Sequence, residues 1–365
     1  MKIATIQGDG FQTLVKSIAQ KLGQEFIPAP KTTEELIQYS DKISPDNWCL
    51  DVKIVYGCIA RQIEQGADTI LLFHYAYPVI NHGPCLMPWA FDSYFEFGLK
   101  KLFPKKKFKI YSMSWWNRSL LFVKMLSIFK SLGFGPGTMI KIKQGFSTGW
   151  ERVKQMDQLK ELFYYVGATN YLTNKTIYHN AVDAIRNSTD SKEATLIFEK
   201  AKQELLLHKN EADKLPIIGA TGDLFALTID SYPFFNIEEM LVREMGVSVY
   251  QPFTFYKIFD DKENKKLKPY LKKSHKYIKY WIGGSDYYTI PHAIEMKERM
   301  VDGVAHLSVF GCQPEMISRS VIRMIEEVEG FPPMLELTFD SHTQPEAIRV
   351  RLEAFTDMIK AKLNK

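Results

Sequence analysis

Three of the four cysteines in this chain stand where a thiol could do chemistry. Cys312 follows an apolar run in HLSVFGCQPE, Cys85 lies in HYAYPVINHGPCLMPW, and Cys49 precedes a helical pattern in SPDNWCLDVKI. All three are expected in loops beside glycine, proline or candidate helix caps, whereas a cysteine that fills core space would more naturally lie inside a strand or helix. A helix entrance also lowers the pKa of a thiol, so Cys49 is placed to be a thiolate.

The fourth cysteine has a different setting. Cys58 lies nine residues after Cys49, which at about 100° per residue places the two on opposite sides of one continuous helix. It shares its side with an apolar stripe that includes Val55, Ile59 and Ile63. We therefore predict a core thiol at Cys58 and a ligand role for the other three.

Three thiolates from separate loops limit the metals that they could hold. Zinc is one option, with His82 shortly before Cys85 as a fourth ligand, although the usual short Cys-x-x-Cys pair is absent. An iron–sulfur cluster is the stronger option, because it tolerates ligands from distant loops. Three thiolates on a 4Fe-4S cluster would leave one iron open to substrate, water or a non-cysteine ligand.

The elements that position these loops alternate between strands and helices, in two rounds. The sequence predicts a first set of strands at 2–8, 25–30, 68–75 and 107–113. It predicts a second set at 215–222, 247–253, 303–311 and 333–340, with a helix at 291–303 and a long closing helix from 344. Continuous apolar strands that alternate with helices favour parallel sheets covered on both faces.

We therefore expect an α/β fold with two Rossmann-like lobes and a cluster in the cleft between them. The expected N-terminal lobe spans residues 1–118 and the expected C-terminal lobe, with its long closing helix, spans 211–365. A mainly helical insert or bridge, 119–210, joins them. Parallel sheets carry functional groups in loops at the carboxyl ends of their strands, where Cys85 and Cys312 are predicted.

The composition is typical of a large globular protein and excludes some partners. The 365 residues are 45% hydrophobic, and the net charge is 47 − 42 = +5. The densest basic stretch, 257–279, is interleaved with acidic residues and is interpreted as solvated surface, so no nucleic-acid partner is expected. No run reaches the roughly 18 apolar residues of a membrane span, and no signal sequence precedes the first strand. We expect no membrane association and a cytoplasmic location, where structural disulfides are rare.

Motifs along nearly the whole chain also resemble those of one family. GVAHLSVFGCQPE contains a strand that leads to an FGC-x-PE turn, and PMLELTFDSHTQPEAIRVRLEAF contains a second strand followed by an aspartate, a histidine and a helix. CLDVKIVYG, GPC and IIGATGDLFALTIDSYPFFN precede them in the chain. In this order the motifs are similar to those of the 2-hydroxyacyl-CoA dehydratase and acyl-CoA dehydratase activase-related iron–sulfur proteins.

The resemblance implies a low-potential 4Fe-4S cluster held from both lobes by Cys49, Cys85 and Cys312. It also implies that a separate ATP-hydrolysing activator protein supplies the electrons. In the dehydratases proper the electron passes to a 2-hydroxyacyl-CoA thioester, and subunits act in pairs, so a homodimer or heterodimer is expected.

Departures from the family pattern bear on the substrate more than on the cluster. Asp51 replaces a proline, Ser341 replaces a glutamate, and Val350 replaces a threonine. Two functions therefore stay open. The first is an oxygen-sensitive reductase or dehydratase-like lyase component that acts on a small substrate such as an acyl-CoA. The second is a noncatalytic electron-transfer or scaffold protein with a closed cluster or a zinc site.

Overall fold

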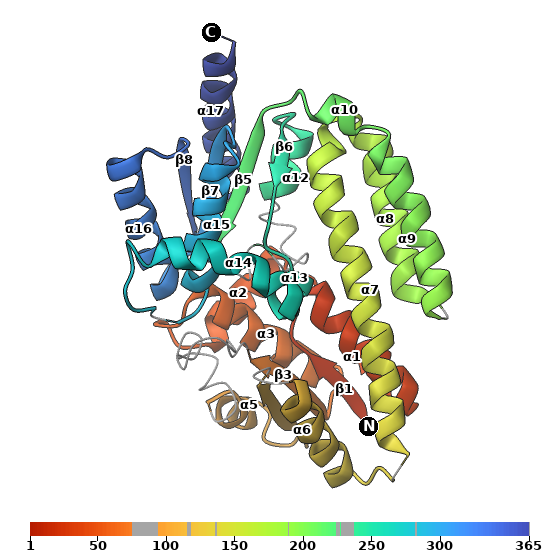
Figure 1. The fold of residues 1–365 in the computed structure, drawn as a ribbon. Coiled ribbons are helices and arrows are strands. Elements are labelled where there is room, and N and C mark those ends of the chain that lie inside the picture. The colour runs from red at the N-terminus through yellow and green to blue at the C-terminus, as the bar shows by residue number, and fades with distance from the viewer. Residues whose placement is uncertain are drawn as a thin grey trace.

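Two parallel sheets organise the chain (Figure 1). The computed structural model describes residues 1–74, 94–114, 118–135, 137–188, 190–223, 227, 237–281 and 283–364. Within these ranges each sheet has four strands, ordered β2-β1-β3-β4 in the first and β6-β5-β7-β8 in the second. The predicted α/β fold with two Rossmann-like lobes is confirmed.

The first lobe is built on the sheet of β1 (Lys2–Thr5), β2 (Glu25–Ile27), β3 (Thr69–His74) and β4 (Lys109–Ser114). Its described helices are α1 (Asp9–Leu22), α2 (Glu34–Ile43), α3 (Leu50–Glu64) and α5 (Glu96–Leu102). In α1 the residues Leu14, Ile18 and Leu22 recur at helical spacing and are buried. The helix ends at Gly23, whose φ of 66° is a left-handed conformation that glycine adopts without strain.

Helices fill the segment between the sheets. They are α6 (Arg118–Ser131), α7 (Thr138–Val166), the short 3-10 helix η2 (Gly167–Thr169), α8 (Tyr171–Asn187), α9 (Ser191–Leu206) and α10 (Lys209–Ala212). The start of α9 is fixed by Asp190, whose carboxylate accepts from the backbone N–H groups of Lys192 and Glu193 at 2.8 and 3.0 Å. None of the helices in the described ranges combines the length and apolar composition needed to cross a membrane.

The second lobe repeats the strand order of the first. Its strands are β5 (Ile217–Gly222), β6 (Ser248–Tyr250), β7 (Gly303–Val309) and β8 (Met334–Phe339). Its described helices are α12 (Ile237–Arg243), α13 (Phe255–Phe259), α14 (Asp261–Ser274), α15 (Asp286–Glu298), α16 (Gln313–Glu329) and α17 (Pro345–Leu363). Every residue of β7 is buried, because this strand pairs with β5 on one side and β8 on the other.

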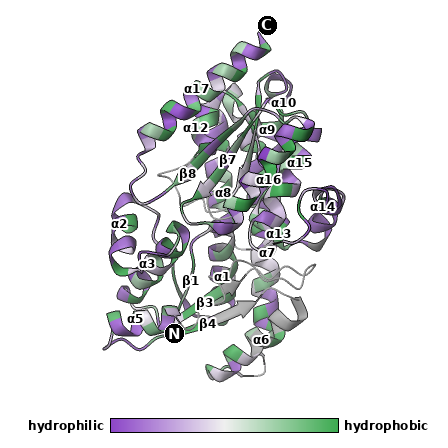
Figure 2. Ribbon diagram, turned by 90° about the vertical axis from the view of Figure 1, so that its left-hand side faces the viewer, coloured by the Kyte–Doolittle hydropathy of each residue, from purple (hydrophilic) through white to green (hydrophobic). Residues whose placement is uncertain are grey.

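One sequence-based expectation needs correction in this lobe. The helix predicted at 291–303 spans Asp286–Glu298, and Pro291 lies inside it, so the proline does not mark the start. The basic stretch 257–279 is predicted as solvated surface, and its lysines from Lys262 onward are exposed; the structure adds that much of the stretch folds as α14, which also contains a proline. Figure 2 shows α14 almost wholly hydrophilic, which explains why an apolar periodicity did not reveal it.

The shared strand order creates a switch point in each sheet. The chain steps from β5 outward to β6 and then crosses back to β7 on the other side, so the connections after β5 and β7 diverge. Ligands bind at such points in open parallel sheets. Asp223 directly follows β5, and Cys312 lies in the turn after β7. The fold therefore places a carboxylate and a candidate ligand thiol at the same edge.

The 29-residue helix α7 ties the middle segment to the first lobe through glycines. A Cβ added at Gly145 would lie 2.7 Å from the Cα of Ile18 and 2.9 Å from the carbonyl oxygen of Ser17. At Gly149 an added Cβ would lie 3.0 Å from the Cα of Leu14. The backbones of α1 and α7 therefore approach each other more closely than any side chain would allow. Figure 1 shows α7 running from beside α1 toward β6.

We predict that Gly145→Ala lowers the free energy of unfolding by about 1–3 kcal/mol, because the added methyl group meets backbone atoms that cannot turn away. The matched control is Gly135→Ala, where an added Cβ has nothing within 4 Å. Chemical denaturation of both variants measures the difference. Equal stability of the two variants would contradict the close approach of α1 and α7.

Candidate functional site

Two of the three predicted ligand cysteines occupy the same structural position in different lobes. Cys49 is the N-cap residue of α3, and Cys312 is the N-cap residue of α16. Neither side chain caps its helix by a hydrogen bond, and neither cysteine forms a disulfide with another described cysteine. The third predicted ligand, Cys85, lies outside the described residues, as does the alternative zinc ligand His82.

The turn that carries Cys312 lies against Cys49. Gly311 has a φ of 84°, and a Cβ added there would be 3.8 Å from both the Cα and the Cβ of Cys49. The start of α3 in the first lobe and the start of α16 in the second lobe are therefore neighbours, although their sequences are far apart. This contact brings together two of the residues on which the sequence-based metal hypothesis depends.

The convergence of two helix N-termini favours negative charge between them. The free backbone N–H groups of a helix start carry partial positive charge, which stabilises a thiolate or another anion. The helices α3 and α16 are 15 and 17 residues long. Both helices therefore favour Cys49 and Cys312 as thiolate ligands.

Burial and the carboxylates around Cys312 raise the pKa of its thiol, which is opposite to the effect of the helix starts. The Sγ of Cys312 lies 3.5 Å from Oδ2 of Asp223. Burial raises the pKa of the Cys312 thiol well above its usual value, and the negative charges of Asp223, Glu315 and Asp51 raise it further. Without a cation this thiol stays protonated. A metal ion or cluster bound here would lower the pKa of the thiol again, because its positive charge favours the deprotonated form of a coordinating thiol.

A buried polar network holds the turn in place. The Oε2 of Glu315 lies 2.8 Å from Nε2 of His306, and Oε1 accepts from the Thr289 hydroxyl at 2.9 Å. That hydroxyl also lies 3.0 Å from the carbonyl oxygen of Gly222, the last residue of β5. The network joins the end of β5 and the middle of β7 to α15 and α16, so it holds the residue before Asp223 and the first turn of α16 in one set of contacts. The sequence motif contains Glu315 but gave no sign of its partners, because they come from distant elements.

The remaining cysteine lies in the core, as its helical spacing predicts. Cys58 is fully buried inside α3, and burial raises the pKa of its thiol far above the usual value. A neutral, enclosed thiol of this kind packs as a small apolar side chain and does not bind metal.

The other polar candidates form local contacts. The Oδ1 of Asp340 accepts from the backbone N–H of His342 at 2.9 Å, which makes an ordinary loop turn. Among the described residues, no group of three or more histidine, cysteine, aspartate or glutamate side chains is arranged to hold a metal ion. The predicted ligand set of Cys49, Cys85 and Cys312 stays a prediction, because Cys85 lies outside the described residues.

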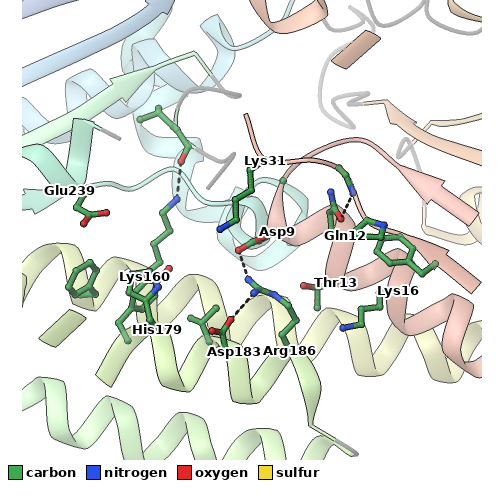
Figure 3. A pocket seen from close by; sticks show the side chains of 18 of the residues that line it. Asp9, Gln12, Thr13, Lys16, Lys31, Lys160, His179, Asp183, Arg186 and Glu239 are labelled. Carbon is green, nitrogen blue, oxygen red and sulfur yellow. Dashed lines mark hydrogen bonds and ion pairs between the residues drawn. The ribbon is translucent and has the colours of Figure 1, made fainter. Parts of the chain in front are cut away.

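A cavity of about 740 Å³ lies between the first lobe and the helical segment (Figure 3). Its walls come from the start of α1, the chain after β2, α7, α8 and α12. Leu227, which lines it, donates its backbone N–H to the carbonyl of Asp223 at 3.2 Å. The cavity is therefore connected through one backbone hydrogen bond to the residue beside Cys312. Its volume is within the range of small-molecule sites.

The charges in this cavity leave positive groups available for a ligand. Arg186 is shared between Asp9 and Asp183, at 2.6 and 2.9 Å. Lys16 and Lys31 form no ion pair within the described part of the chain, and Lys16 contacts only the amide oxygen of Asn187, at 3.1 Å. Burial lowers the pKa of Lys16, and the charges of Arg186 and Arg152 lower it further. An anionic ligand would relieve this repulsion.

Comparisons with known proteins add no relative. A scan against protein-family models finds no match, and a search of curated proteins finds none. The resemblance to the 2-hydroxyacyl-CoA dehydratase family therefore depends on the sequence motifs and stays a prediction.

The proximity of Cys49 and Cys312 is testable in the metal-free protein. In a variant that keeps only these two cysteines, Cys58→Ala with Cys85→Ser, dibromobimane should bridge the two thiols and become fluorescent, because the reagent links only neighbouring thiols. The control variant, Cys49→Ala with Cys85→Ser, keeps Cys58 and Cys312 and should show no bridging. Equal fluorescence in both variants, at a pH high enough for Cys312 to react with monobromobimane, would contradict the contact between the two helix starts.

Proposed function

We propose that this chain is a cytoplasmic iron–sulfur protein that reduces a small anionic substrate, of the acyl-CoA class, at a 4Fe-4S cluster. Cys49, Cys85 and Cys312 would hold the cluster where the two lobes meet. The observation that carries the proposal is the contact of the Cys312 turn with Cys49. Gly311, the residue before the N-cap Cys312 of α16, lies there against Cys49, the N-cap residue of α3 in the other lobe, next to a sheet switch point.

The chemistry of the bound cluster would be the transfer of single electrons at low potential. The chain itself would do three things around it. Two helix N-termini would offset negative charge on the thiolates, the Glu315 network would hold the Cys312 turn, and Asp223 would stand beside one ligand sulfur. The wall of the cavity along α1 has as many carboxylates as cations, and within it the phosphates of a CoA thioester would be held by Lys16 and Lys31, which form no ion pair with a described residue.

An external electron source would be needed, and the surface beside the site supports protein docking. Phe310, two residues before Cys312, is 71% exposed, and Met316 one turn into α16 is 54% exposed. Single exposed apolar side chains are common on protein surfaces, so the docking assignment depends on the nearness of these two to Cys312. We assign this surface to an ATP-hydrolysing activator protein, as the sequence resemblance implies. A second copy of the chain or a sister subunit would complete the expected dimer.

A second function is favoured by one observation. The carboxylate of Asp223 lies 3.5 Å from the Cys312 sulfur, so it could supply an oxygen ligand that closes the cluster or completes a zinc site. The protein would then be an electron carrier or a scaffold without a substrate site at the metal. Asp223→Asn separates these alternatives, because removal of a closing ligand would open the metal to small ligands that the native protein excludes.

Cysteine variants test the metal centre directly. Anaerobically purified protein should contain about four irons and four sulfides per chain and show a paramagnetic resonance signal when reduced. Cys312→Ala should lose most of the iron, since a ligand is removed. Cys58→Ala is the matched control and should keep the cluster while losing packing stability of about 1 kcal/mol. One zinc per chain without sulfide, or equal iron loss in both variants, would overturn the cluster proposal.

Charge reversal tests the substrate cavity. Lys16→Glu should weaken the binding of coenzyme A about tenfold, because one charged hydrogen bond to a phosphate is replaced by repulsion. Lys21→Glu, on the same helix α1 but outside the cavity wall, is the control and should bind as the native protein does. Isothermal titration with coenzyme A gives both affinities. Equal weakening by the two changes would place the phosphates elsewhere.

A further inference from the structure

A second cavity, of about 450 Å³, opens on a different face of α7 from the first. Its walls come from α7, the end of β6, α13, α14 and α15. No motif in the sequence pointed to it, and the proposed cluster chemistry makes no use of it. Its polar groups are nonetheless arranged in a connected and partly buried set.

The centre of that set is a carboxylate with three donors. The Oε2 of Glu295 lies 3.0 Å from Nδ1 of His292, while Oε1 accepts from the Tyr250 hydroxyl at 2.8 Å and from Nε of Arg299 at 3.0 Å. Burial alone would raise the pKa of Glu295, but its hydrogen bonds to His292, Tyr250 and Arg299 outweigh burial and lower the pKa to about 2. Glu295 is therefore ionised and can only accept hydrogen bonds.

This arrangement fixes the tautomer of His292. Since Glu295 can only accept, Nδ1 of His292 must carry the proton and donate it. Burial lowers the pKa of His292, which keeps the ring neutral near pH 7. The other ring nitrogen, Nε2, is then an acceptor, and it forms no hydrogen bond with any residue that the structure describes. His292 lines the cavity, so this acceptor is available to a ligand.

A second acceptor comes from α7. The Oε2 of Glu161 is paired with Nζ of Lys257 at 2.8 Å, while its Oε1 is buried and has no hydrogen-bond partner in the described chain. A buried acceptor without a hydrogen bond lowers the stability of the fold, and a ligand hydroxyl could supply that hydrogen bond. The ammonium of Lys257 has further N–H groups that a ligand oxygen could accept from.

The three described cations of the wall each pair with a carboxylate of the wall, and a fourth carboxylate leaves the wall with one net negative charge. Its cations pair with its carboxylates, Lys257 with Glu161 at 2.8 Å, Lys266 with Glu263 at 2.7 Å, and Arg299 with Glu295 at 3.0 Å. The remaining carboxylate, Asp157, accepts from the backbone N–H of Tyr256 at 2.6 Å. A charged ligand would disturb these pairs. A neutral ligand that both donates and accepts hydrogen bonds would not.

We propose that this cavity is a second binding site, for a neutral polyhydroxylated molecule of the sugar or polyol class, in which His292 Nε2 and Glu161 Oε1 accept hydrogen bonds from its hydroxyl groups. Hydroxyl groups supply both donors and acceptors, which matches a wall with two open acceptors and spare ammonium N–H groups. The rings of Phe253, Tyr256 and Tyr270 also line the cavity, and their flat faces suit the C–H face of a ring-shaped polyol.

Ring nitrogen resonances provide a direct test. The chain has eight histidines, so labelling of the imidazole nitrogens with ¹⁵N in the whole protein gives few signals. Three probes of similar size are titrated separately: myo-inositol for hydroxyl groups, putrescine for ammonium groups and adipate for carboxylates. Myo-inositol should shift the Nε2 resonance of His292 saturably, and the other two should not.

Substitutions in α15 and in α7 test the two proposed acceptors separately. His292→Phe keeps a flat ring but removes the acceptor, and Glu161→Gln on α7 replaces an acceptor without touching the histidine. Each should weaken inositol binding, measured by calorimetry, about tenfold. His208→Phe, outside the cavity wall, is the control and should bind normally. A shift of Nε2 by putrescine or adipate but not by inositol would overturn the ligand class, and undiminished binding by both cavity variants would overturn the site.

Discussion

The close approach of Gly311 to Cys49 is the contact on which the account of the site depends. It joins the start of α16 in the second lobe to the start of α3 in the first, so two candidate ligand thiols adjoin only while the lobes stay together. A Cβ added at Gly311 would make an ordinary van der Waals contact with Cys49, so glycine is required here by the φ of 84° and not by lack of space. The helix α7, pressed against α1 through Gly145 and Gly149, stabilises the frame in which the lobes meet.

Two opposing effects act on the protonation of the two candidate ligand thiols. The helix starts favour thiolates, whereas burial and the charges of Asp223, Glu315 and Asp51 favour the neutral thiol at Cys312. A site with this balance changes its protonation when a cation binds, which is the behaviour expected of a metal centre and not of a simple reactive cysteine. The two cavities differ in the same respect, since Lys16 and Lys31 in the first form no ion pair with a described residue, whereas each cation in the wall of the second pairs with a carboxylate.

The sequence predicted the repeated strand–helix order well, because buried parallel strands such as β7 are continuous apolar runs. The spacing of Cys49 and Cys58 likewise separated an N-cap thiol from a core thiol. The sequence patterns predicted neither α14, where the buried Leu267 and Leu271 stand among mostly polar residues, nor the start of α15, where Pro291 was misleading. The partners of Glu315 and the Tyr250–Glu295–His292 set are joined by tertiary contacts alone, so no local pattern could have found them.

The most direct test of the central claim is the position of iron in the folded protein. Crystals grown without oxygen from iron- and sulfide-loaded protein would give an anomalous difference map at the iron absorption edge. The account predicts one compact iron peak within bonding distance of the Cys49 and Cys312 sulfurs, about 2.3 Å for a metal–thiolate bond. A map with no iron at the boundary of α3 and α16, or with iron bound to only one of these two cysteines, would contradict it.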